Sequence, residues 1–341
     1  MILIIININN AIPNQTNMGI RNLNRFFRTN AAESISKCTM KELSGKTIAV
    51  DISVYMYRFA TDNLLIENIY LMLALFKHYN IIPLFIFDGK PPIEKRALLD
   101  QRKKRKKEAF KEYQLLQEEC QDDVDNVYLK NLKRQFINIS KDDIHFVKQL
   151  ICAYGFNYYD APEEADVLCA ILAIQQHVWA CLSEDMDMCV YGCPRIIRCL
   201  SLMNHSVMLY DMTKILTQLN ICQKELRDIC VLAGTDYNTE TEENNIWGDD
   251  NILNSVLKYY KQYYKYKTLQ QQQTPLLEFY EWLLQYHPQR ITNYKLLKSI
   301  VERFDINTYQ NINVHNVVIA NNPVSKDIVQ NILKIDGFLF V

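Results

Sequence analysis

The sequence lacks close cysteine pairs, long apolar runs and a net excess of charge, and each absence narrows the possible functions. Its ten cysteines include no Cys-x-x-Cys pair, and Cys189 and Cys193, four residues apart, are poorly spaced for a zinc knuckle. We interpret them as reduced thiols of an intracellular protein. Residues 1–6 are apolar, but a membrane span takes about 20 such residues, so we expect no membrane partner. The net charge is only −1, so binding to a polyanion must use locally concentrated charge.

The chain has enough apolar material for a full core. With 341 residues, of which 49% are hydrophobic, it can form one large α/β domain and a helical appendage. Residues 1–17 lack the basic start of a signal peptide. We expect Met18 to be the native start and residues 1–17 to be an extension that is not native.

Acidic residues directly follow three apolar, β-rich runs. These are residues 47–50 before Asp51, residues 82–87 before Asp88, and residues 178–182 before Asp185 and Asp187. In open α/β sheets the functional crevice lies outside the carboxyl ends of the strands, so these acids should converge. Glu164 and Asp166 fall in the opening turn of a helix predicted from Pro162 to about Gln175, and Asp236 follows a predicted helix over residues 224–232.

Seven clustered carboxylates indicate a metal site. Ionised carboxylates a few ångströms apart raise each other's pKa unless cations neutralise them. Oxygen ligands of this kind suit Mg²⁺ or Mn²⁺, and two such ions can stabilise the attacking and leaving oxygens in phosphodiester hydrolysis. The alternative for any single acid is a helix cap or a turn former.

A basic stretch begins seven residues after Asp88. Between Lys95 and Lys107 there are eight Lys or Arg and one acid. On a helix, Lys95, Arg102 and Lys106 share one face, where they could contact phosphates and stabilise a transition state. The alternatives are a solvated helix and a nuclear-localisation signal.

Six segments, in this order, resemble the signature segments of the flap endonuclease/XPG family of structure-specific 5′ nucleases: MGIRNL (18–23), IAVD (48–51), FDGKPP (87–92), APEEAD (161–166), EDMD (184–187) and LAGTDY (232–237). The resemblance covers about two thirds of the chain. It implies a PIN-like α/β fold, with a central, mostly parallel sheet flanked by helices, a helical arch and a C-terminal helical extension.

The resemblance also implies roles for individual residues. The acids at positions 51, 88, 164, 185, 187 and 236 match family metal ligands, while Asp166 stands where close relatives usually have Glu, which shortens that arm by a methylene. They would hold two Mg²⁺ ions, for which Mn²⁺ could substitute. Lys95 and Arg102 match catalytic residues that touch the scissile phosphate at the base of the arch. Expected nucleic-acid contacts are Gly19, Tyr57, Arg105, Lys106, Gly248 and Lys258. Tyr57 would stack on a base, although a lone tyrosine is more often simply packed.

Beyond Tyr237 the resemblance weakens. The family's glycine-rich hairpin is reduced to Gly248. It is followed by Asp249 and Asp250, where basic residues are expected. We expect the grip on duplex DNA to have moved to lysines of a predicted helix over residues 252–266, Lys258 among them. Asp336 and Gly337 occupy the aromatic positions of a sliding-clamp motif, so we expect no clamp recruitment through this tail.

These patterns predict a division into residues 1–17 as the extension, 18–113 as the N-terminal nuclease region, 114–143 as an arch or mobile segment, 144–240 as the region completing the active site, 241–275 as a DNA-binding helical region with a linker, and 276–341 as a helical extension. The predicted function is a Mg²⁺-dependent nuclease, a DNA endonuclease or 5′–3′ exonuclease, acting on flaps or 5′ ends in replication and repair. Flap, exonuclease and junction preferences remain open.

The alternative is a catalytically weak or inactive scaffold of the same fold that binds nucleic acid. We expect a monomer whose partner is branched or 5′-ended DNA. It would work in the nucleus or at another site of DNA replication, which for a viral member would be the host nucleus or cytoplasm.

Overall fold

The computed structural model describes residues 20, 22–119, 127–238, 247, 252–269, 277–312, 314, 316–335 and 337–338. Four of the predictions fall outside the described residues: the extension over 1–17, the contacts by Gly19 and Gly248, and the linker over 270–275. All nine cysteines in the described part of the chain are free thiols. No helix in that part is long and apolar enough to cross a bilayer.

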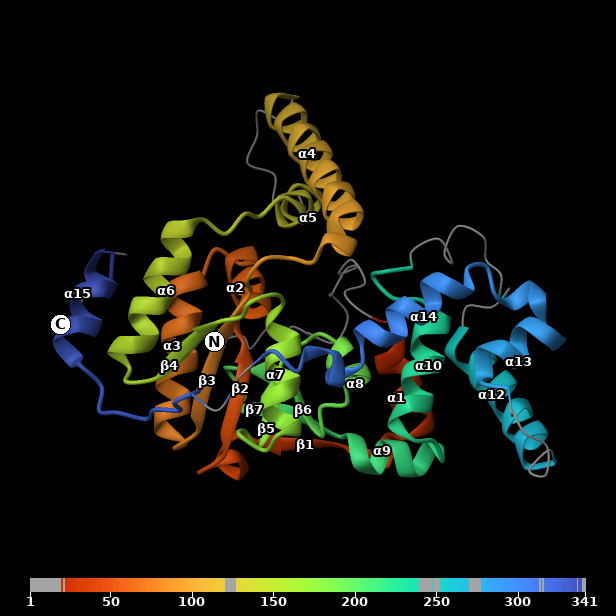
Figure 1. The fold of residues 1–341 in the computed structure, drawn as a ribbon. Coiled ribbons are helices and arrows are strands. Elements are labelled where there is room, and N and C mark those ends of the chain that lie inside the picture. The colour runs from red at the N-terminus through yellow and green to blue at the C-terminus, as the bar shows by residue number, and fades with distance from the viewer. Residues whose placement is uncertain are drawn as a thin grey trace, which may run out of the picture.

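A seven-stranded sheet forms the centre of the molecule, in the order β1-β7-β6-β5-β2-β3-β4 (Figure 1). Its strands are β1 (Ile35–Thr39), β2 (Thr47–Asp51), β3 (Ile82–Phe87), β4 (Asn157–Asp160), β5 (Ala180–Leu182), β6 (Arg195–Ser201) and β7 (Ser206–Asp211). Neighbours from β6 to β4 pair in parallel, while β7 pairs antiparallel with both β6 and β1. The predicted mostly parallel sheet is confirmed.

Helices cover both faces of this sheet. They are α1 (Leu23–Asn30), α2 (Ile52–Thr61), α3 (Leu65–His78), α4 (Arg96–Glu119), α5 (Val127–Gln135), α6 (Lys141–Ala153), α7 (Ala165–Ile174), α8 (Asp187–Tyr191), α9 (Met212–Leu219), α10 (Gln223–Ala233), α12 (Ile252–Leu269), α13 (Phe279–Tyr286), α14 (Tyr294–Arg303) and α15 (Lys326–Ile335). Short 3₁₀ turns are η2 (Ala32–Ser34), η3 (Met40–Leu43), η4 (Ile93–Lys95), η5 (Pro288–Arg290) and η6 (Ile306–Tyr309).

The strands are apolar throughout because both of their faces are buried. Successive side chains of a strand point to opposite faces. On β2, Ile48 and Val50 accordingly join one core with α2, α3 and α6, while Ala49 joins the other core with α7, α8 and α10. Continuous apolar runs are typical of parallel strands covered on two sides.

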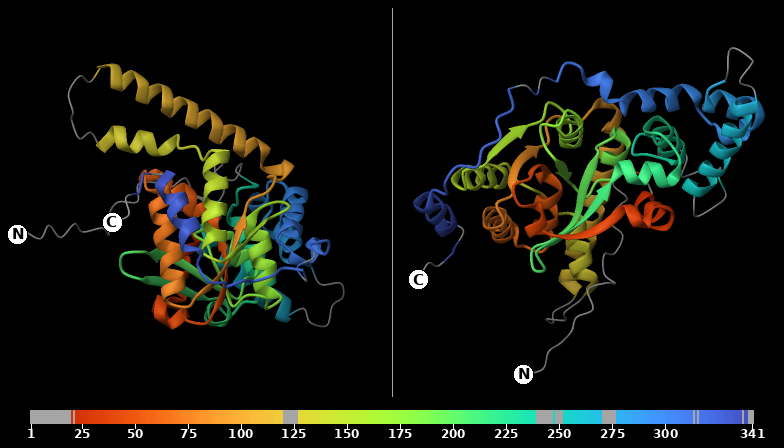
Figure 2. Two further views of the ribbon diagram at one scale, coloured as in Figure 1. Left: turned by 90° about the vertical axis from the view of Figure 1, so that its left-hand side faces the viewer. Right: turned by 90° about the horizontal axis from the view of Figure 1, so that it is seen from below.

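Helices α4 and α5 form an antiparallel hairpin that rises away from the sheet (Figure 2). Helix α4 continues to Glu119, past the expected boundary at residue 113. The ring of Phe136, just after α5, packs on Phe110 and Tyr113 of α4, with centroids 5.2 and 5.3 Å away. The helical part of the predicted arch or mobile segment is therefore packed against α4.

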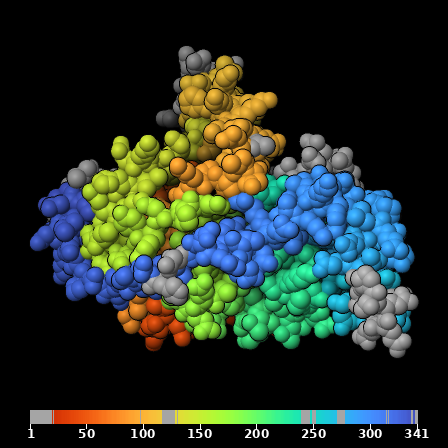
Figure 3. Space-filling model, in the orientation of Figure 1, coloured from red at the N-terminus to blue at the C-terminus, as the bar shows by residue number. Residues whose placement is uncertain are grey.

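A C-terminal strap, residues 316–325, lies along β4 at the edge of the sheet, where the side chains of Asn157 and Tyr159 donate to its carbonyls. It leads into α15, which packs against α6 on the surface (Figure 3). The backbone amide of Asn322 donates to the carbonyl of Gly155 at 2.8 Å, and that of Ser325 donates to Ala153 at 2.8 Å. Gly155 follows α6 with φ of +75°, a left-handed conformation that favours glycine. The strap covers an edge that would otherwise expose unpaired backbone groups.

The strap contact can be tested by adding one methyl group. A Cβ on Gly155 would lie 2.2 Å from the carbonyl oxygen of Asn322, whereas a Cβ on Gly45, at a similar φ of +73°, would meet nothing within 4 Å. We expect Gly45→Ala to cost about 1–2 kcal/mol through backbone strain alone. Gly155→Ala should cost clearly more in urea unfolding, because the strap must move as well. Equal losses would contradict the strap's contribution.

Candidate active site

The predicted acidic residues lie at the carboxyl ends of the central strands and at the ends of adjoining helices. Asp51 ends β2, Asp88 follows β3, Asp185 follows β5, Asp187 begins α8, Glu164 and Asp166 open α7, and Asp236 follows α10. Strands β2, β3 and β5 are parallel neighbours, so their carboxyl ends meet at one edge of the sheet.

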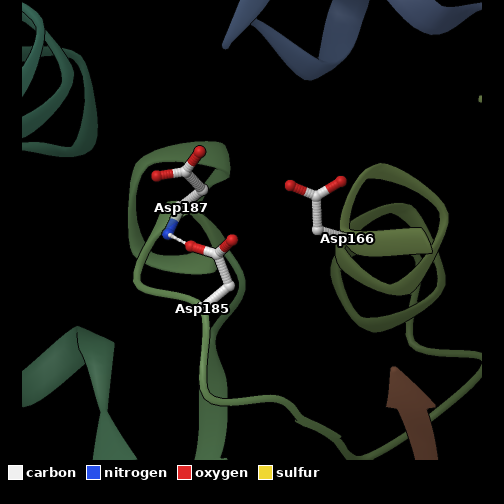
Figure 4. A group of neighbouring side chains, drawn as sticks. All are labelled: Asp166, Asp185 and Asp187. Atoms are coloured by element: carbon white, nitrogen blue, oxygen red, sulfur yellow. Dashed lines mark hydrogen bonds between the residues drawn. The ribbon is translucent and has the colours of Figure 1, made fainter. Parts of the chain in front are cut away.

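Three of these carboxylates form a tight group (Figure 4). Asp166, Asp185 and Asp187 each offer an oxygen, and these oxygens all lie within 4.8 Å of one another. Asp166 projects from α7, Asp185 comes from the turn after β5, and Asp187 is the first residue of α8. Such a set of hard oxygen donors fits a small divalent cation.

Several of these oxygens are buried without compensation. Asp187 is only 1% exposed, and neither of its carboxylate oxygens has a hydrogen-bond partner among the described residues. The same holds for Oδ1 of Asp51, while its Oδ2 accepts a hydrogen bond from Ser183 at 2.8 Å. Buried acceptors normally find partners, so these oxygens fit a cation-binding role.

Burial and mutual repulsion shift the acids away from the charged form. Burial raises the pKa of Asp187 well above its usual value, and the neighbouring Asp185 raises it further. The pKa of Asp51 is raised in the same way, by burial first and then by Asp88. Burial also raises the pKa of Asp166, with a further contribution from Glu164. Each shift means that the negative charge of the carboxylate is unfavourable until a proton or a bound cation neutralises it.

Asp88 joins β3 to α7. Its Oδ1 accepts from the backbone amide of Ala165 at 2.8 Å, so it caps this helix from a distant part of the chain. The amide of Gly89 donates to the carbonyl of Glu163 at 2.6 Å, and a Cβ on Gly89 would lie 1.9 Å from the carbonyl oxygen of Ala161. This close approach, which only glycine permits, brings Asp88 beside the start of α7.

The same approach corrects one prediction. Pro162 was expected in the first turn of a helix, but α7 begins at Ala165 and Pro162 lies in the preceding loop. The amide of Ala161 donates to the carbonyl of Phe87 at 2.8 Å, which holds this segment along the end of β3. Glu164 is consequently the N-cap residue, with extended backbone.

Two basic residues are paired with acids of the site. Lys95 is only 7% exposed, and its Nζ donates a hydrogen bond to Oε1 of Glu164 at 2.7 Å. Arg102, near the base of α4, donates to Oδ2 of Asp236 at 2.9 Å. Burial alone would lower the pKa of Lys95, but the neighbouring Tyr237 and carboxylates such as Asp166 outweigh it and raise this pKa well above its usual value. Lys95 therefore carries a positive charge.

Two site residues were missed by sequence reasoning. The hydroxyl of Tyr237 donates to Oε2 of Glu164 at 3.0 Å, and the ammonium of Lys95 lies 4.9 Å from the centre of its ring. Ser183 donates to Asp51 and accepts from the amide of Asp185 at 3.1 Å. Their only signal in the sequence is that each lies within two residues of a predicted acid.

The remaining predicted contacts lie outside the acidic group. Tyr57 on α2 is 46% exposed, and the ammonium of Lys106 lies 5.3 Å from its ring. Lys106 also donates to the carbonyl of Ile137 at 2.9 Å, which ties α4 to the segment after α5. Arg105 is exposed on α4, and Lys258 is exposed on α12, which packs against α10.

Removing one buried charge should stabilise the cation-free protein. The raised pKa of Asp187 means that its contribution to stability is fully present below about pH 4 and is lost as the pH rises through the folded-state value. Asp187→Asn should therefore raise the free energy of unfolding in EDTA by about 1–3 kcal/mol at pH 8, and by less at pH 5. Asp62→Asn, on an exposed side chain, is the control. A loss of stability at pH 8 for Asp187→Asn would contradict this account.

Comparison with known proteins gives two family matches. The XPG N-terminal domain matches residues 18–109, and the XPG I-region matches residues 155–236. The chain is 30% identical over 240 residues to flap endonuclease 1 of Meyerozyma guilliermondii. The aligned region covers 64% of this chain and 63% of that protein. It is 30% identical over 236 residues to flap endonuclease 1 of Mus musculus, covering 64% and 61%. The chain thus spans less than two thirds of the length of these relatives.

Solved structures confirm the fold. The catalytic core of Rad2 in complex with DNA substrate is similar with a TM-score of 0.64 and 20% identity, over 93% of this chain and 94% of that chain. Human GEN1 in complex with Holliday junction DNA is similar with a TM-score of 0.55 and 16% identity, over 92% and 72%. At these identities the likeness establishes the arrangement of sheet and helices, which agrees with the predicted PIN-like class.

Proposed function

Since this chain belongs to the flap endonuclease/XPG family, we propose that it is a Mg²⁺-dependent, structure-specific nuclease that hydrolyses phosphodiester bonds at DNA 5′ flaps or 5′ ends. The observation that carries this proposal is the group formed by Asp166, Asp185 and Asp187, with its buried and uncompensated oxygens. The preference for flaps follows the curated relatives, which are named flap endonucleases. The role would lie in DNA replication and repair.

In this proposal the acids hold two cations. Asp185 and Asp187 lie on one side of the group, and Asp166, with Glu164 and Asp88 nearby, lies on the other. When bound, two Mg²⁺ ions would stabilise the negative charge that develops on the attacking and leaving oxygens. Asp166 reaches the group although its arm is shorter than that of Glu.

In this proposal Lys95 and Arg102 receive the scissile phosphate. Each is a cation held at the acidic group by one carboxylate, Glu164 or Asp236. Arg102 is the more accessible of the two, with 30% of its side chain exposed. The oxygens of a phosphodiester that enters here would replace the carboxylates as partners of Lys95 and Arg102. The positive charges of these two side chains would then neutralise charge in the transition state.

The elements around the site suit DNA. Tyr57 presents an exposed ring on which a base could stack, and α4 carries the exposed Arg105 on the hairpin. Lysines of α12, including Lys258, would contact duplex phosphates farther from the acids. Contacts of this kind position the substrate without reading its sequence.

Cleavage of a 5′-labelled flap DNA tests the proposal. The full chain should incise near the flap junction in Mg²⁺ and not in EDTA. Asp185→Ala and Lys95→Ala should each lower the single-turnover rate by at least about 100-fold, because Asp185 would hold a cation and Lys95 is itself a cation that stabilises transition-state charge. Asp327→Ala, an exposed acid on α15, is the control.

The same assay can also contradict the proposed function. If flap, nicked, junction and single-stranded DNAs all yield no Mg²⁺-dependent product while the protein still binds DNA, the function is that of a non-catalytic scaffold.

Arg105 and Lys106 should differ in their effect on DNA binding. Arg105 is free to meet phosphate on the exposed side of α4, so Arg105→Ala should weaken binding and reduce the slope of log Kd against log[KCl] by about 0.7–0.9. The ammonium of Lys106 is already bound to the carbonyl of Ile137, so Lys106→Ala should change this slope less. Lys214→Ala, on an exposed residue of α9, is the control. Equal slopes for all three variants would show that α4 does not contact phosphate.

A further inference from the structure

We propose that Arg303, the last residue of α14, is a positioning residue of the active site. It lies beyond both family-matched segments, the second of which ends at residue 236. It nevertheless contacts the neighbours of two site residues, Lys95 and Glu164. The inference rests on the proposed function and adds to it a positioning residue from the C-terminal region.

The guanidinium of Arg303 bridges two separate parts of the chain. Its Nη1 lies 3.2 Å from Oε2 of Glu94 in η4, and its Nη2 lies 3.3 Å from Oε2 of Glu163 in the loop before α7. Only 16% of its side chain is exposed. Its central carbon also lies 5.0 Å from the centre of the Tyr237 ring. One side chain thus contacts three segments.

Each of these contacts is one step from a functional group. Glu94 directly precedes Lys95, and Glu163 directly precedes Glu164. Tyr237 donates to Glu164 and lies beneath the ammonium of Lys95, which in turn donates to the same carboxylate. If Arg303 fixes Glu94, Glu163 and the ring, it fixes the separation of Lys95 and Glu164.

Arg303 is not needed merely to anchor α14. The next residue, Phe304, is completely buried, and its ring packs 4.9 Å from Tyr191 and 5.8 Å from Tyr237. The Nε of Arg303 is buried and has no hydrogen-bond partner among the described residues. Desolvation alone would lower the pKa of Arg303, but the contacts of the guanidinium with Tyr237 and Glu94 outweigh this cost and raise the pKa, so its charge holds these neighbours in place. The arrangement fits alignment of the site better than attachment of the helix.

Arg303→Met, made in the full chain, tests the proposal. It keeps the length of the side chain and removes the charge. A misplacement of about 1 Å at a reacting centre can cost about 100-fold in rate. We expect the single-turnover cleavage rate to fall by about 10- to 100-fold, with DNA affinity changed by less than about twofold. Without DNA, the affinity for Mn²⁺ measured by electron paramagnetic resonance should fall about 3- to 10-fold, since Glu164 loses its fixed position.

Matched variants separate positioning from folding. Lys298→Met, on the exposed side of the same helix and paired with Glu281, should leave all three quantities unchanged. Arg303→Lys can reach only one of the two carboxylates and should recover part of the Mn²⁺ affinity. Glu94→Gln weakens one arm at an exposed residue, and should produce a smaller loss in the same direction. If Arg303→Met fails to fold, Glu94→Gln and Glu163→Gln decide the matter.

The proposal is overturned if Mn²⁺ affinity and single-turnover rate stay at their wild-type values in Arg303→Met, or in both glutamine variants. It is also overturned if the rate falls only in proportion to the fraction of unfolded protein. If the wild-type chain cleaves no DNA, the proposed function fails, but the Mn²⁺ measurement still decides whether Arg303 positions Glu164.

Discussion

Repulsion among carboxylates at one edge of the sheet is the constraint on which the rest of the site depends. Burial makes each charge on Asp51, Asp166 and Asp187 costly. The described residues offset part of this cost with two cations, Lys95 and Arg102, each supplied by the base of the α4–α5 hairpin. The acidic group and the base of the hairpin are therefore linked by these two ion pairs.

One glycine, Gly89, decides how closely the loops that carry these acids can approach. The backbone contact at Gly89 lets the loop after β3 touch the loop before α7, so that Asp88 can cap α7. A single Cβ at that point would push the two loops apart. The geometry of the acids is consequently set by backbone contacts as much as by the acids themselves.

The sequence was informative where a residue's role follows from a local pattern. Apolar runs ending in acids placed β2, β3 and β5 and the edge where they meet, and helical patterns placed α10 and α12. The six motifs identified the family. The division into regions and the individual roles of the site residues remain predictions.

Other features have no local pattern. Arg303 reaches the site from residues that match neither family segment, and nothing in its neighbourhood distinguishes it from an ordinary basic residue at the end of a helix. The strap is held by backbone bonds to Ala153 and Gly155 and by the side chains of Asn157 and Tyr159 on β4, and such scattered contacts leave no periodicity in the sequence. Pro162 was misplaced because the contact that holds its loop comes from Gly89, more than 70 residues earlier.

The strap also has a consequence for the order in which the protein is made. A chain that has left the ribosome only through Asp211 contains all seven strands, including β1 and β7, which pair with each other. The outer edge of β4 stays open until residues 316–325 have been synthesised, about a hundred residues later. Throughout that interval the nascent sheet presents a free edge to other chains, so newly made protein depends on the last part of its own sequence to close it.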